Sequence, residues 1–500
     1  MANHHPVVGR IGSGPSEDAL SDGSERSFHH FPEGKHCVFN LSGVSRAIQV
    51  CEHIVESPPR TLGESPNPPQ CTWFTRSSRT TIALKRESAE IFVRRSTMAE
   101  AHDVVIIGAG QAGLSLSHEL TRMGREHVLL ERGKVGQSWR GRWDSFCLVL
   151  PNWTIQLPGQ SYVGDEPDGF LRRDDFVNYL VSYAESFQAP VRQEVNVNSL
   201  QRSRNGGFQI STSAGEILAR EVVVASGGYQ RPHRPPGVEH LPKSMLILDA
   251  ESYTNPGALP SGKVLVVGSG QSGCQVAEDL ALAGREVFLS CGRAPWIPRR
   301  IGDRDVIAWL ARTSFFDATL ASLPSPMARL NANPQVSGRD GGHDLNYRTL
   351  HAMCVNLVGH FVGVEDGRAR FAPDLAKSVA FGDALYEDIC KIIGKSAEAQ
   401  GIRAPTMPTP TQFSADPPES VGLDDFSAAI ITSGFRPDYQ SWVRFPDAFD
   451  QMGFPIQQDG SSSVVPGLHF MGVHFQRKRA SATLLGVGED AKILANGIVN

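Results

Sequence analysis

The chain has 500 residues, enough for two or three domains. Its 48 basic and 53 acidic residues nearly balance, so the charge gives no indication of a nucleic-acid partner. No stretch approaches the roughly 18 apolar residues of a membrane span, and the N-terminus lacks the apolar core of a signal peptide. The eight cysteines show no CxxC spacing. We therefore expect a cytoplasmic protein with no membrane span, no metal site and no redox-active disulfide.

Residues 1–97 differ in composition from the rest of the chain. They are rich in Ser, Pro, His and Arg and have few apolar clusters. Little apolar surface can therefore be buried to offset the conformational entropy that is lost on ordering. A transit peptide would be poor in acids, whereas this segment carries Glu17 and Asp18 near its start. We predict a disordered extension, or a start assigned too far upstream, and a compact fold that begins at Met98.

Residues 103–132 predict a strand–helix–strand unit that binds a dinucleotide. The β-branched run 104–107 is typical of a strand covered on both faces, and a GxGxxG motif follows it directly. The first glycine permits the tight turn, the second lets a pyrophosphate approach, and the third lets helix and strand pack closely. Glu131 ends the second strand, where a carboxylate can accept hydrogen bonds from an adenosine ribose. The expected cofactor-binding residues are Gly108, Ala109, Gly110, Gln111, Ala112, Gly113, Glu131 and Arg132.

Residues 263–290 repeat this pattern, and the repetition predicts a second nucleotide-binding unit. Its second strand ends in Ser290, followed by Arg293, and not in an acid. A carboxylate would repel a 2′-phosphate, whereas a hydroxyl and an arginine would bind it, so the first unit suits FAD or NAD and the second suits NADPH. Arg299 and Arg300 follow; for each arginine alone a solvated basic loop is an equal alternative, but the group favours phosphate binding. The expected NADPH-binding residues are Gly268, Ser269, Gly270, Gln271, Ser272, Gly273, Ser290 and Arg293.

Segments outside the two units carry further candidates. Gln137, Ser138 and Trp139 lie in a stretch with two tryptophans and two arginines, which can lie along an extended cofactor; core or lid packing is the alternative for each tryptophan alone. Ala225 and Gly227 end an apolar strand in small residues, which lets the backbone lie close to a cofactor. Asp490 lies in a glycine turn that opens an acidic helix start, and this turn can hold the pyrimidine end of a flavin.

The remaining pattern predicts secondary structure and connections. Helices are expected at 170–187, 305–310, 349–357, 375–393 and 491–498, and strands at 195–210, 216–224, 426–431 and 467–472. The Pro-rich stretch 231–237 is typical of a crossing between domains, residues 322–342 of a loop or lid, and residues 405–418 of a linker.

From Met98 onward, about four-fifths of its length, the chain resembles the flavin-containing monooxygenases (class B flavoprotein monooxygenases) and their CzcO-like relatives. The resemblance rests on the two glycine motifs and on residues 136–139 (similar to GGxW), 225–227 (similar to ATG), 433–437 (similar to TGYxP) and 486–491. It implies an α/β fold with two dinucleotide-binding Rossmann-like domains, the second inserted into the first. The implied FAD-binding domain comprises residues 98–236 and 426–500, and the implied NADPH-binding domain, with a helical and loop insertion, residues 237–425.

The resemblance also implies an FAD- and NADPH-dependent monooxygenase, similar to N,N-dimethylaniline monooxygenase. NADPH would reduce FAD, the reduced flavin would react with O2 at C4a, and the resulting (hydro)peroxyflavin would pass one oxygen atom to a small organic substrate. Because the flavin does this chemistry, no acid–base pair or nucleophile triad is required. Asn152 falls near an asparagine that lies beside the reacting flavin in the family, so it is the candidate catalytic residue. No nucleic acid is implied as a partner, and a homodimer is left open.

The chain departs from the family signature FxGxxxHxxx(Y/F/W) between the two units. Residues 243–253 match it, but Lys243, Met245 and Asp249 replace Phe, Gly and His, and only Tyr253 is kept. The Trp-Pro of Baeyer–Villiger enzymes is also absent, which disfavours that subclass. An NADPH oxidase or quinone-type reductase of the same fold therefore stands as the alternative. A pyridine-nucleotide–disulfide reductase lacks its cysteine pair here, and a non-catalytic binding module would not need two intact sites.

Overall fold

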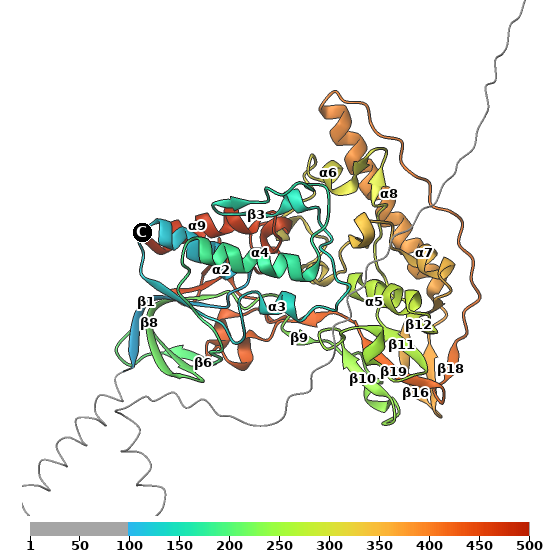
Figure 1. Cartoon of the computed structure of the whole chain (residues 1–500), viewed down its shortest axis with the longest axis horizontal. Coiled ribbons are helices and arrows are strands. Elements are labelled where there is room, and N and C mark those ends of the chain that lie inside the picture. The colour runs from blue at the N-terminus through green and yellow to red at the C-terminus, as the bar shows by residue number, and fades with distance from the viewer. Residues whose placement is uncertain (1–98, 500) are drawn as a thin grey trace, which may run out of the picture. The chain divides into compact units, whose positions relative to one another are not determined.

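The structure is a computed structural model that describes residues 99–499, and Figure 1 shows their elements. The prediction for residues 1–97 lies outside the described residues. Two sheets, one with a parallel centre and one entirely parallel, carry the two predicted nucleotide units together with their helices. The predicted α/β class with two Rossmann-like units is thus confirmed, because the chain leaves the first sheet, builds the second and then returns to the first.

The first sheet is built around the predicted strand 104–107. β1 (Glu100–Ile107) pairs in parallel with β2 (His127–Leu130) on one side and β8 (Gly215–Val224) on the other. β5 (Val191–Arg192) extends the sheet beyond β2, and β23 (Leu468–Phe470) extends it beyond β8. The side chains of residues 104–107 are buried, as expected of a strand covered on both faces.

Helices next to this sheet follow the predicted pattern closely. α2 (Gln111–Arg122) begins directly after the glycine turn and packs against α9 (Val487–Val499) and α4 (Arg173–Ser186). Figure 1 shows α2, α4 and α9 near β1 and β8. α2 buries leucines at helical spacing, and this apolar face explains why the segment forms a helix here. α3 (Gln137–Arg140) is a single turn between β2 and α4.

An antiparallel layer extends the first sheet. β6 (Val197–Arg202) pairs with β7 (Phe208–Thr212), and β7 pairs with the first half of β8. The expectation of one strand over 195–210 is wrong, because a turn with positive φ at Gly206 and Gly207 divides it into two strands. On the same side of β8 as β7, β21 (Gln457–Gln458) and β22 (Ser461–Ser462) add an antiparallel pair next to β23.

The second sheet is entirely parallel, in the order β10-β19-β11-β12-β15. Its strands are β10 (Leu246–Asp249), β19 (Phe426–Ile431), β11 (Lys263–Val267), β12 (Val287–Ser290) and β15 (Asn356–Val358). β19 lies between β10 and β11, so the expected return of the chain to the first domain at residue 426 is wrong, and the return follows Ile431. An apolar strand carries no signal for which of two apolar sheets it joins.

The remaining elements connect and cover the second sheet. The predicted crossing at 231–237 contains β9 (Arg231–Pro232), which pairs with β20 (Phe435–Arg436), so the outgoing and returning chains run side by side. The helices here are α5 (Gln271–Leu282), α6 (Val306–Leu310), α7 (Tyr347–Ala352) and α8 (Leu375–Ala399). The small sheets here are β13 (Arg300–Ile301) with β14 (Arg304–Asp305), and β16 (Phe361–Glu365), β17 (Arg368–Phe371) and β18 (Ser420–Gly422). A further small sheet, β3 (Gln156–Leu157) with β4 (Gln160–Ser161), lies near the first sheet, where β3 contacts α9.

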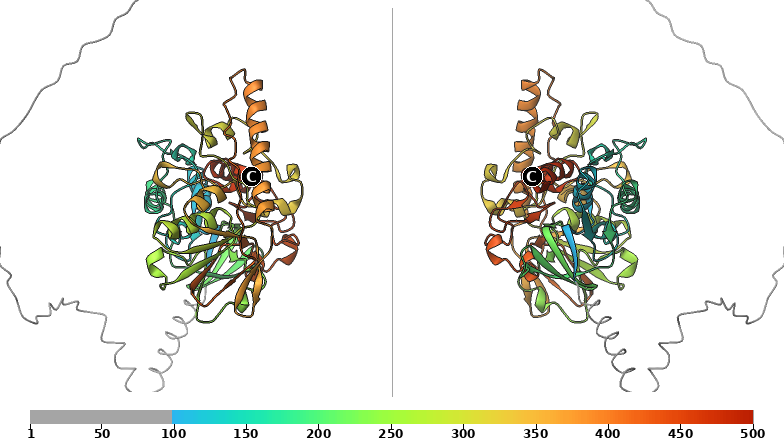
Figure 2. Two further views of the ribbon diagram at one scale, coloured as in Figure 1. Left: turned by 90° about the vertical axis from the view of Figure 1, so that its right-hand side faces the viewer. Right: turned by 90° about the vertical axis from the view of Figure 1, so that its left-hand side faces the viewer.

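α8 is six residues longer than the predicted helix 375–393. Figure 2 shows its C-terminal turns, in orange, standing clear of both sheets. There they pack against the region of α6, where Ile393 and Ile307 share an apolar cluster, and this contact lets the helix continue. Within residues 99–499, we find no helix that is long and apolar enough to cross a membrane.

Candidate functional site

The first glycine turn leaves space at one glycine and none at the other two. A Cβ built on Gly110 meets no atom of the described residues within 4 Å. A Cβ on Gly113 would overlap the carbonyl oxygen of Gly108, and a Cβ on Gly108 would lie 2.5 Å from the carbonyl oxygen of Ala225. The backbone of α2 therefore packs tightly on the turn, while the approach to Gly110 stays open for a pyrophosphate.

Glu131 joins the end of β2 to this turn. Its Oε2 accepts a hydrogen bond from the N–H of Ala109 at 2.8 Å, and its Oε1 accepts one from the N–H of Gly133 at 3.0 Å. The carboxylate is buried, with 6% of the residue exposed, so its orientation is fixed. It keeps lone pairs that can accept hydrogen bonds from ribose hydroxyls. Arg132, by contrast, is exposed.

The GQSW stretch packs on the start of α2. The Trp139 indole N–H donates to Gln111 Oε1 at 2.9 Å, and the ring lies edge-on against Phe176 of α4. Gln137 Oε1 accepts from the N–H of Lys134 at 3.1 Å, while Ser138 is exposed. Gln111 and Trp139 are thus brought together, and both hold the helix start in place.

The strand ends beside the two glycine turns repeat the same arrangement. The Ala225 N–H donates to the Ile107 carbonyl at 2.9 Å, which places the end of β8 against the first turn, and Gly227 has φ +84°. At the second turn the Thr432 N–H donates to the Val267 carbonyl at 2.8 Å. ASG after β8 and TSG after β19 therefore have equivalent places.

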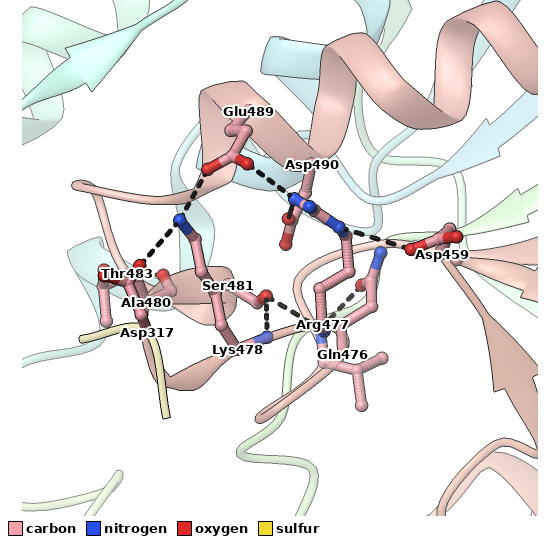
Figure 3. A network of polar contacts seen from close by, with 12 residues as sticks. Asp317, Asp459, Gln476, Arg477, Lys478, Ala480, Ser481, Thr483, Glu489 and Asp490 are labelled. Carbon is pink, nitrogen blue, oxygen red and sulfur yellow. Dashed lines mark hydrogen bonds and ion pairs between the residues drawn. The ribbon is translucent and has the colours of Figure 1, made fainter. Parts of the chain in front are cut away.

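Asp490 lies in the first turn of α9, within the polar network drawn in Figure 3. Its side chain has no exposed surface, Oδ1 accepts from the Arg477 guanidinium at 3.1 Å, and Oδ2 has no hydrogen-bond partner among the described residues. Burial raises the pKa of this carboxyl to about 6. An orphaned, buried carboxylate oxygen at a helix start is an acceptor for a ligand hydroxyl.

The rest of the network holds the start of α9 against a neighbouring segment. Arg477 also binds Glu489 at 3.0 Å and Asp459 at 3.3 Å, and Lys478 bridges Glu489 at 2.7 Å and Asp317 at 3.1 Å. No sequence pattern marks Arg477, because its partners lie on two separate segments, at Asp459 and at the start of α9. Its role is to neutralise Asp490 without filling all of the carboxylate's acceptor sites.

The second glycine turn packs internally like the first, but residues 332 and 336 lie closer to it. A Cβ on Gly273 would overlap the Gly268 carbonyl, whereas the atom nearest to a Cβ on Gly270 is Ala332 Cβ, at 3.8 Å. The Gln271 side chain donates to the Val336 carbonyl at 2.8 Å and accepts from the Val336 N–H at 3.2 Å. Ser269 is buried, and its hydroxyl lies 2.6 Å from that of Tyr347; Ser272 is partly exposed.

The residues expected at the 2′-phosphate are not equally placed for it. Arg293 is exposed, with its guanidinium 5.9 Å from the ring centre of Phe381. Ser290 is buried and donates its hydroxyl proton to the Gly359 carbonyl at 3.1 Å, so it has no proton left to give a phosphate. Arg299 is buried and pairs with Asp305, so the expectation that it joins a phosphate-binding group is wrong. Arg293 is the best placed of these side chains.

Asn152, the predicted catalytic residue, holds the backbone of a loop together. Its amide donates to the Glu166 carbonyl at 2.9 Å and accepts from the Leu171 N–H at 2.8 Å, and the residue is only 2% exposed. Both polar atoms of the amide are therefore engaged by the backbone of one loop. Asn152 therefore organises residues 166–171, and its catalytic role stays a prediction.

The cysteines near the second turn do not form a redox site. Cys274 and Cys291 have no exposed surface, both are free thiols, and burial raises the pKa of each thiol. A buried thiol with a raised pKa does not form the thiolate that disulfide exchange requires. These two described cysteines are therefore structural.

The two open glycine turns, the strand-end acid and the orphaned Asp490 oxygen fit a flavin nucleotide and a pyridine nucleotide. Together with the two parallel sheets they define a class, the two-dinucleotide-domain flavoprotein oxidoreductases. Residues 105–312 match the family pattern of pyridine nucleotide-disulphide oxidoreductases. A CzcO-like oxidoreductase of Geobacillus kaustophilus is 30% identical over 401 residues, which cover 80% of this chain and 98% of that protein.

Two further comparisons agree. The indole-3-pyruvate monooxygenase YUCCA4 of Oryza sativa subsp. japonica is 32% identical over 436 residues, covering 79% of this chain and 87% of that protein. A flavin-containing monooxygenase from Stenotrophomonas maltophilia has a similar fold, with a TM-score of 0.56 at 20% identity, over 80% of this chain and 98% of that chain. The chain belongs to the flavin-containing-monooxygenase-like family of oxidoreductases, within which it resembles the CzcO-like proteins.

Membership confirms the resemblance predicted from the motifs. The chain is a flavin-dependent oxidoreductase of the monooxygenase class, and the cofactors of this class are FAD and NADPH. The monooxygenases among its relatives use small-molecule substrates and O2.

Proposed function

We propose that the first glycine turn binds FAD, the second binds NADPH, and the enzyme inserts one oxygen atom from O2 into a small organic substrate in the cytoplasm. The observation that carries this proposal is the asymmetry of two otherwise equivalent turns. Both leave space at their middle glycine, but the first has the buried acceptor Glu131 at its strand end and the second has the exposed cation Arg293 close behind its own. The first suits a free ribose, and the second a phosphorylated one.

The first unit holds FAD at three points in this proposal. The N–H groups at the start of α2 bind the pyrophosphate beside Gly110, and Glu131 binds the adenosine ribose. The orphaned oxygen of Asp490 accepts a hydrogen bond from a ribityl hydroxyl, and the start of α9 faces the flavin's pyrimidine end. We assign residues 98–236, together with the chain after Ile431, to this FAD-binding domain.

The second unit holds NADPH in the same manner, with the pyrophosphate beside Gly270 and the 2′-phosphate at Arg293. Bound FAD supplies the redox chemistry, since it accepts hydride from NADPH and activates O2. The chain's own residues bind and orient the two nucleotides and exclude water. We assign residues 237–431 to this NADPH-binding domain.

The altered signature at 243–253 favours a second candidate, an NADPH oxidase or quinone-type reductase. Asp249, which stands at the family histidine, pairs with Arg234 at 2.8 Å, and the Tyr253 hydroxyl donates to Asp279 at 2.7 Å. Two signature positions are thus committed to structural contacts. A reductase of the same fold would release hydrogen peroxide and leave the substrate unchanged.

The test is to supply NADPH and O2 with a panel of amines, thioethers and 2-oxo acids and to measure both oxygenated product and peroxide. Acids are included because a relative is named for its action on indole-3-pyruvate. The proposal expects at least one substrate to yield product in step with NADPH use. Stoichiometric peroxide with every compound would favour the reductase.

A further inference from the structure

Two buried acids occupy consecutive positions on α5, the helix that begins at the second glycine turn. The Glu278 and Asp279 side chains are 5% and 7% exposed. Adjacent buried carboxylates repel each other and are costly unless each is paired. Both partners come from one short stretch, residues 335–343, which we call the strap.

The strap supplies one cation or hydrogen-bond donor to each acid. His343 Nε2 lies 2.5 Å from Glu278 Oε1, and this contact raises the pKa of the imidazole. Arg339 donates to Asp279 at 3.0 Å, and the Tyr253 hydroxyl donates to the other oxygen of Asp279 at 2.7 Å. Removal of a strap side chain would leave an uncompensated charge on α5, so the middle of the strap is held firmly on this helix.

The other end of the strap is tied to the nucleotide turn itself. Gln335 donates to the Ser269 carbonyl and to Cys274 Sγ, and the Val336 backbone makes both hydrogen bonds with the Gln271 amide. The strap therefore contacts the start of α5, where a nucleotide's phosphates would bind, and its middle. It cannot shift along α5 without breaking contacts at both places.

The opposite face of the strap contacts the first domain. A Cβ built on Gly338 would overlap the Leu148 carbonyl, and the next-nearest atoms are those of Phe170. The buried Arg299 donates to the Val149 carbonyl at 2.9 Å and reaches the Ser337 carbonyl at 3.5 Å. The Asn152 side chain bonds to the backbone of Glu166 and Leu171 and so holds residues 148–171 together. These residues form the surface of the first domain that contacts the strap.

We propose that the strap positions the NADPH-binding domain against the FAD-binding domain for hydride transfer, with Arg339 and His343 as positioning residues. The strap joins α5, the second nucleotide turn and residues 148–171 by direct contacts. Hydride transfer depends steeply on the distance between the reacting atoms, so a small loss of register slows it without weakening nucleotide binding. This inference rests on the assignment of FAD and NADPH to the two domains.

Two variants test the strap from its two faces. Gly338→Ala adds a methyl group where the strap touches Leu148, at a φ of −98° that alanine accepts, and it leaves the α5 pairs intact. Arg339→Met removes the cation from Asp279 and keeps the length of the side chain, and Arg339→Lys is the conservative rescue. Arg370→Met is the matched control, because Arg370 on β17 forms an exposed pair with Glu365 on β16.

The measurement is anaerobic stopped-flow reduction of the FAD-loaded full chain over a range of NADPH concentrations. We expect Gly338→Ala and Arg339→Met to lower the limiting reduction rate constant at least tenfold while the dissociation constant for NADP⁺ changes less than threefold. Arg339→Lys should recover most of the rate, and the control should match the wild type. Hydrogen exchange of the protein without nucleotide should become faster at 148–171 and 335–343 in both variants.

Unchanged limiting rates in both variants would overturn the inference, as would a slowing explained entirely by weaker NADP⁺ binding. If Arg339→Met fails to retain FAD, Gly338→Ala decides alone, because it disturbs no ion pair. Failure of the proposed function can be distinguished from failure of this inference, because it would appear as no reduction of the wild-type flavin by NADPH. That result would overturn both the proposed function and the role of the strap.

Discussion

The Ala109 N–H donates to Glu131 Oε2 across 2.8 Å, which ties the first glycine turn to the end of β2. The second oxygen of the carboxylate accepts from the Gly133 N–H at 3.0 Å. Two backbone donors on one buried carboxylate fix the geometry of the turn before any nucleotide arrives. The phosphate-binding and ribose-binding parts of the proposed FAD site are therefore one rigid unit.

We predict that Glu131→Gln weakens FAD binding by roughly 10- to 100-fold, because the amide would present a donor to one of two N–H groups and lose charge-assisted hydrogen bonds worth about 1.5–3 kcal/mol. Flavin fluorescence during titration of the flavin-free protein measures the affinity. Glu126→Gln is the control, since Glu126 is an exposed acid whose partners, His102 and the Asp103 N–H, lie outside the turn. Wild-type affinity in Glu131→Gln would remove Glu131 from the site.

Replacing the glycines of the first turn should separate folding from binding. Gly113→Ala places a methyl group against the Gly108 carbonyl, so we expect loss of soluble protein or a much lower melting temperature. Gly110→Ala meets no atom of the described residues, so its flavin-free protein should melt like the wild type while FAD affinity falls at least tenfold. Thermal unfolding and FAD titration of both variants check this. Equal melting temperatures for the two variants would contradict the packing, and full FAD affinity in Gly110→Ala would contradict the binding site.

Arg293 should decide the preference for NADPH over NADH. Arg293→Ala should raise the KM for NADPH by about 10- to 100-fold, because a charged hydrogen bond to phosphate is worth roughly 1.5–3 kcal/mol, and leave the KM for NADH nearly unchanged. Initial rates of flavin reduction with each coenzyme provide the comparison, with Arg370→Ala as an exposed-arginine control. Parallel changes for both coenzymes would exclude Arg293 from the 2′-phosphate site.

The buried carboxyl of Asp490 predicts a dependence of stability on pH. Its pKa is raised from 3.8 to about 6 by burial, so as the pH rises through this window the unfolded chain ionises first and the folded state loses roughly 3 kcal/mol. Asp490→Asn removes this loss. Without FAD, the variant should match the wild type near pH 4 and exceed its stability by a growing margin up to pH 7, as measured by urea unfolding.

The same change should weaken FAD binding, because the orphaned oxygen is the proposed ribityl acceptor. A stabilised protein that binds its cofactor poorly would be a trade of function for stability. A stability difference that does not vary with pH would show that Asp490 is ionised equally in both states. FAD binding that is as tight as in the wild type would remove Asp490 from the site.

The local chemistry of the nucleotide turns was predictable, because a glycine motif between a strand and a helix has few alternative structures. Residues 108–113 and 268–273 form the predicted turns, and both copies are followed by the predicted helices. The strand end at Ala225 also lies where small residues indicated a close approach. In each case the signal lies within a few neighbouring residues.

What could not be predicted depends on contacts between distant segments. The strand Phe426–Ile431 is equally apolar whichever sheet it joins, so its place between β10 and β11 was missed. Arg299 looked like a member of a basic group, but Asp305 and the strap bury it. The roles of Arg339 and His343 were not predicted, because their partners lie 60 and 65 residues earlier on α5.

The measurement that tests the central claim most directly follows the absorbance of the flavin when NADPH-reduced enzyme is mixed with oxygenated buffer in the absence of substrate. The account predicts reduction by NADPH and then a transient absorbance, distinct from both reduced and oxidised flavin, that persists before the oxidised spectrum returns. Immediate return of the oxidised spectrum with stoichiometric hydrogen peroxide would contradict monooxygenation and identify the reductase.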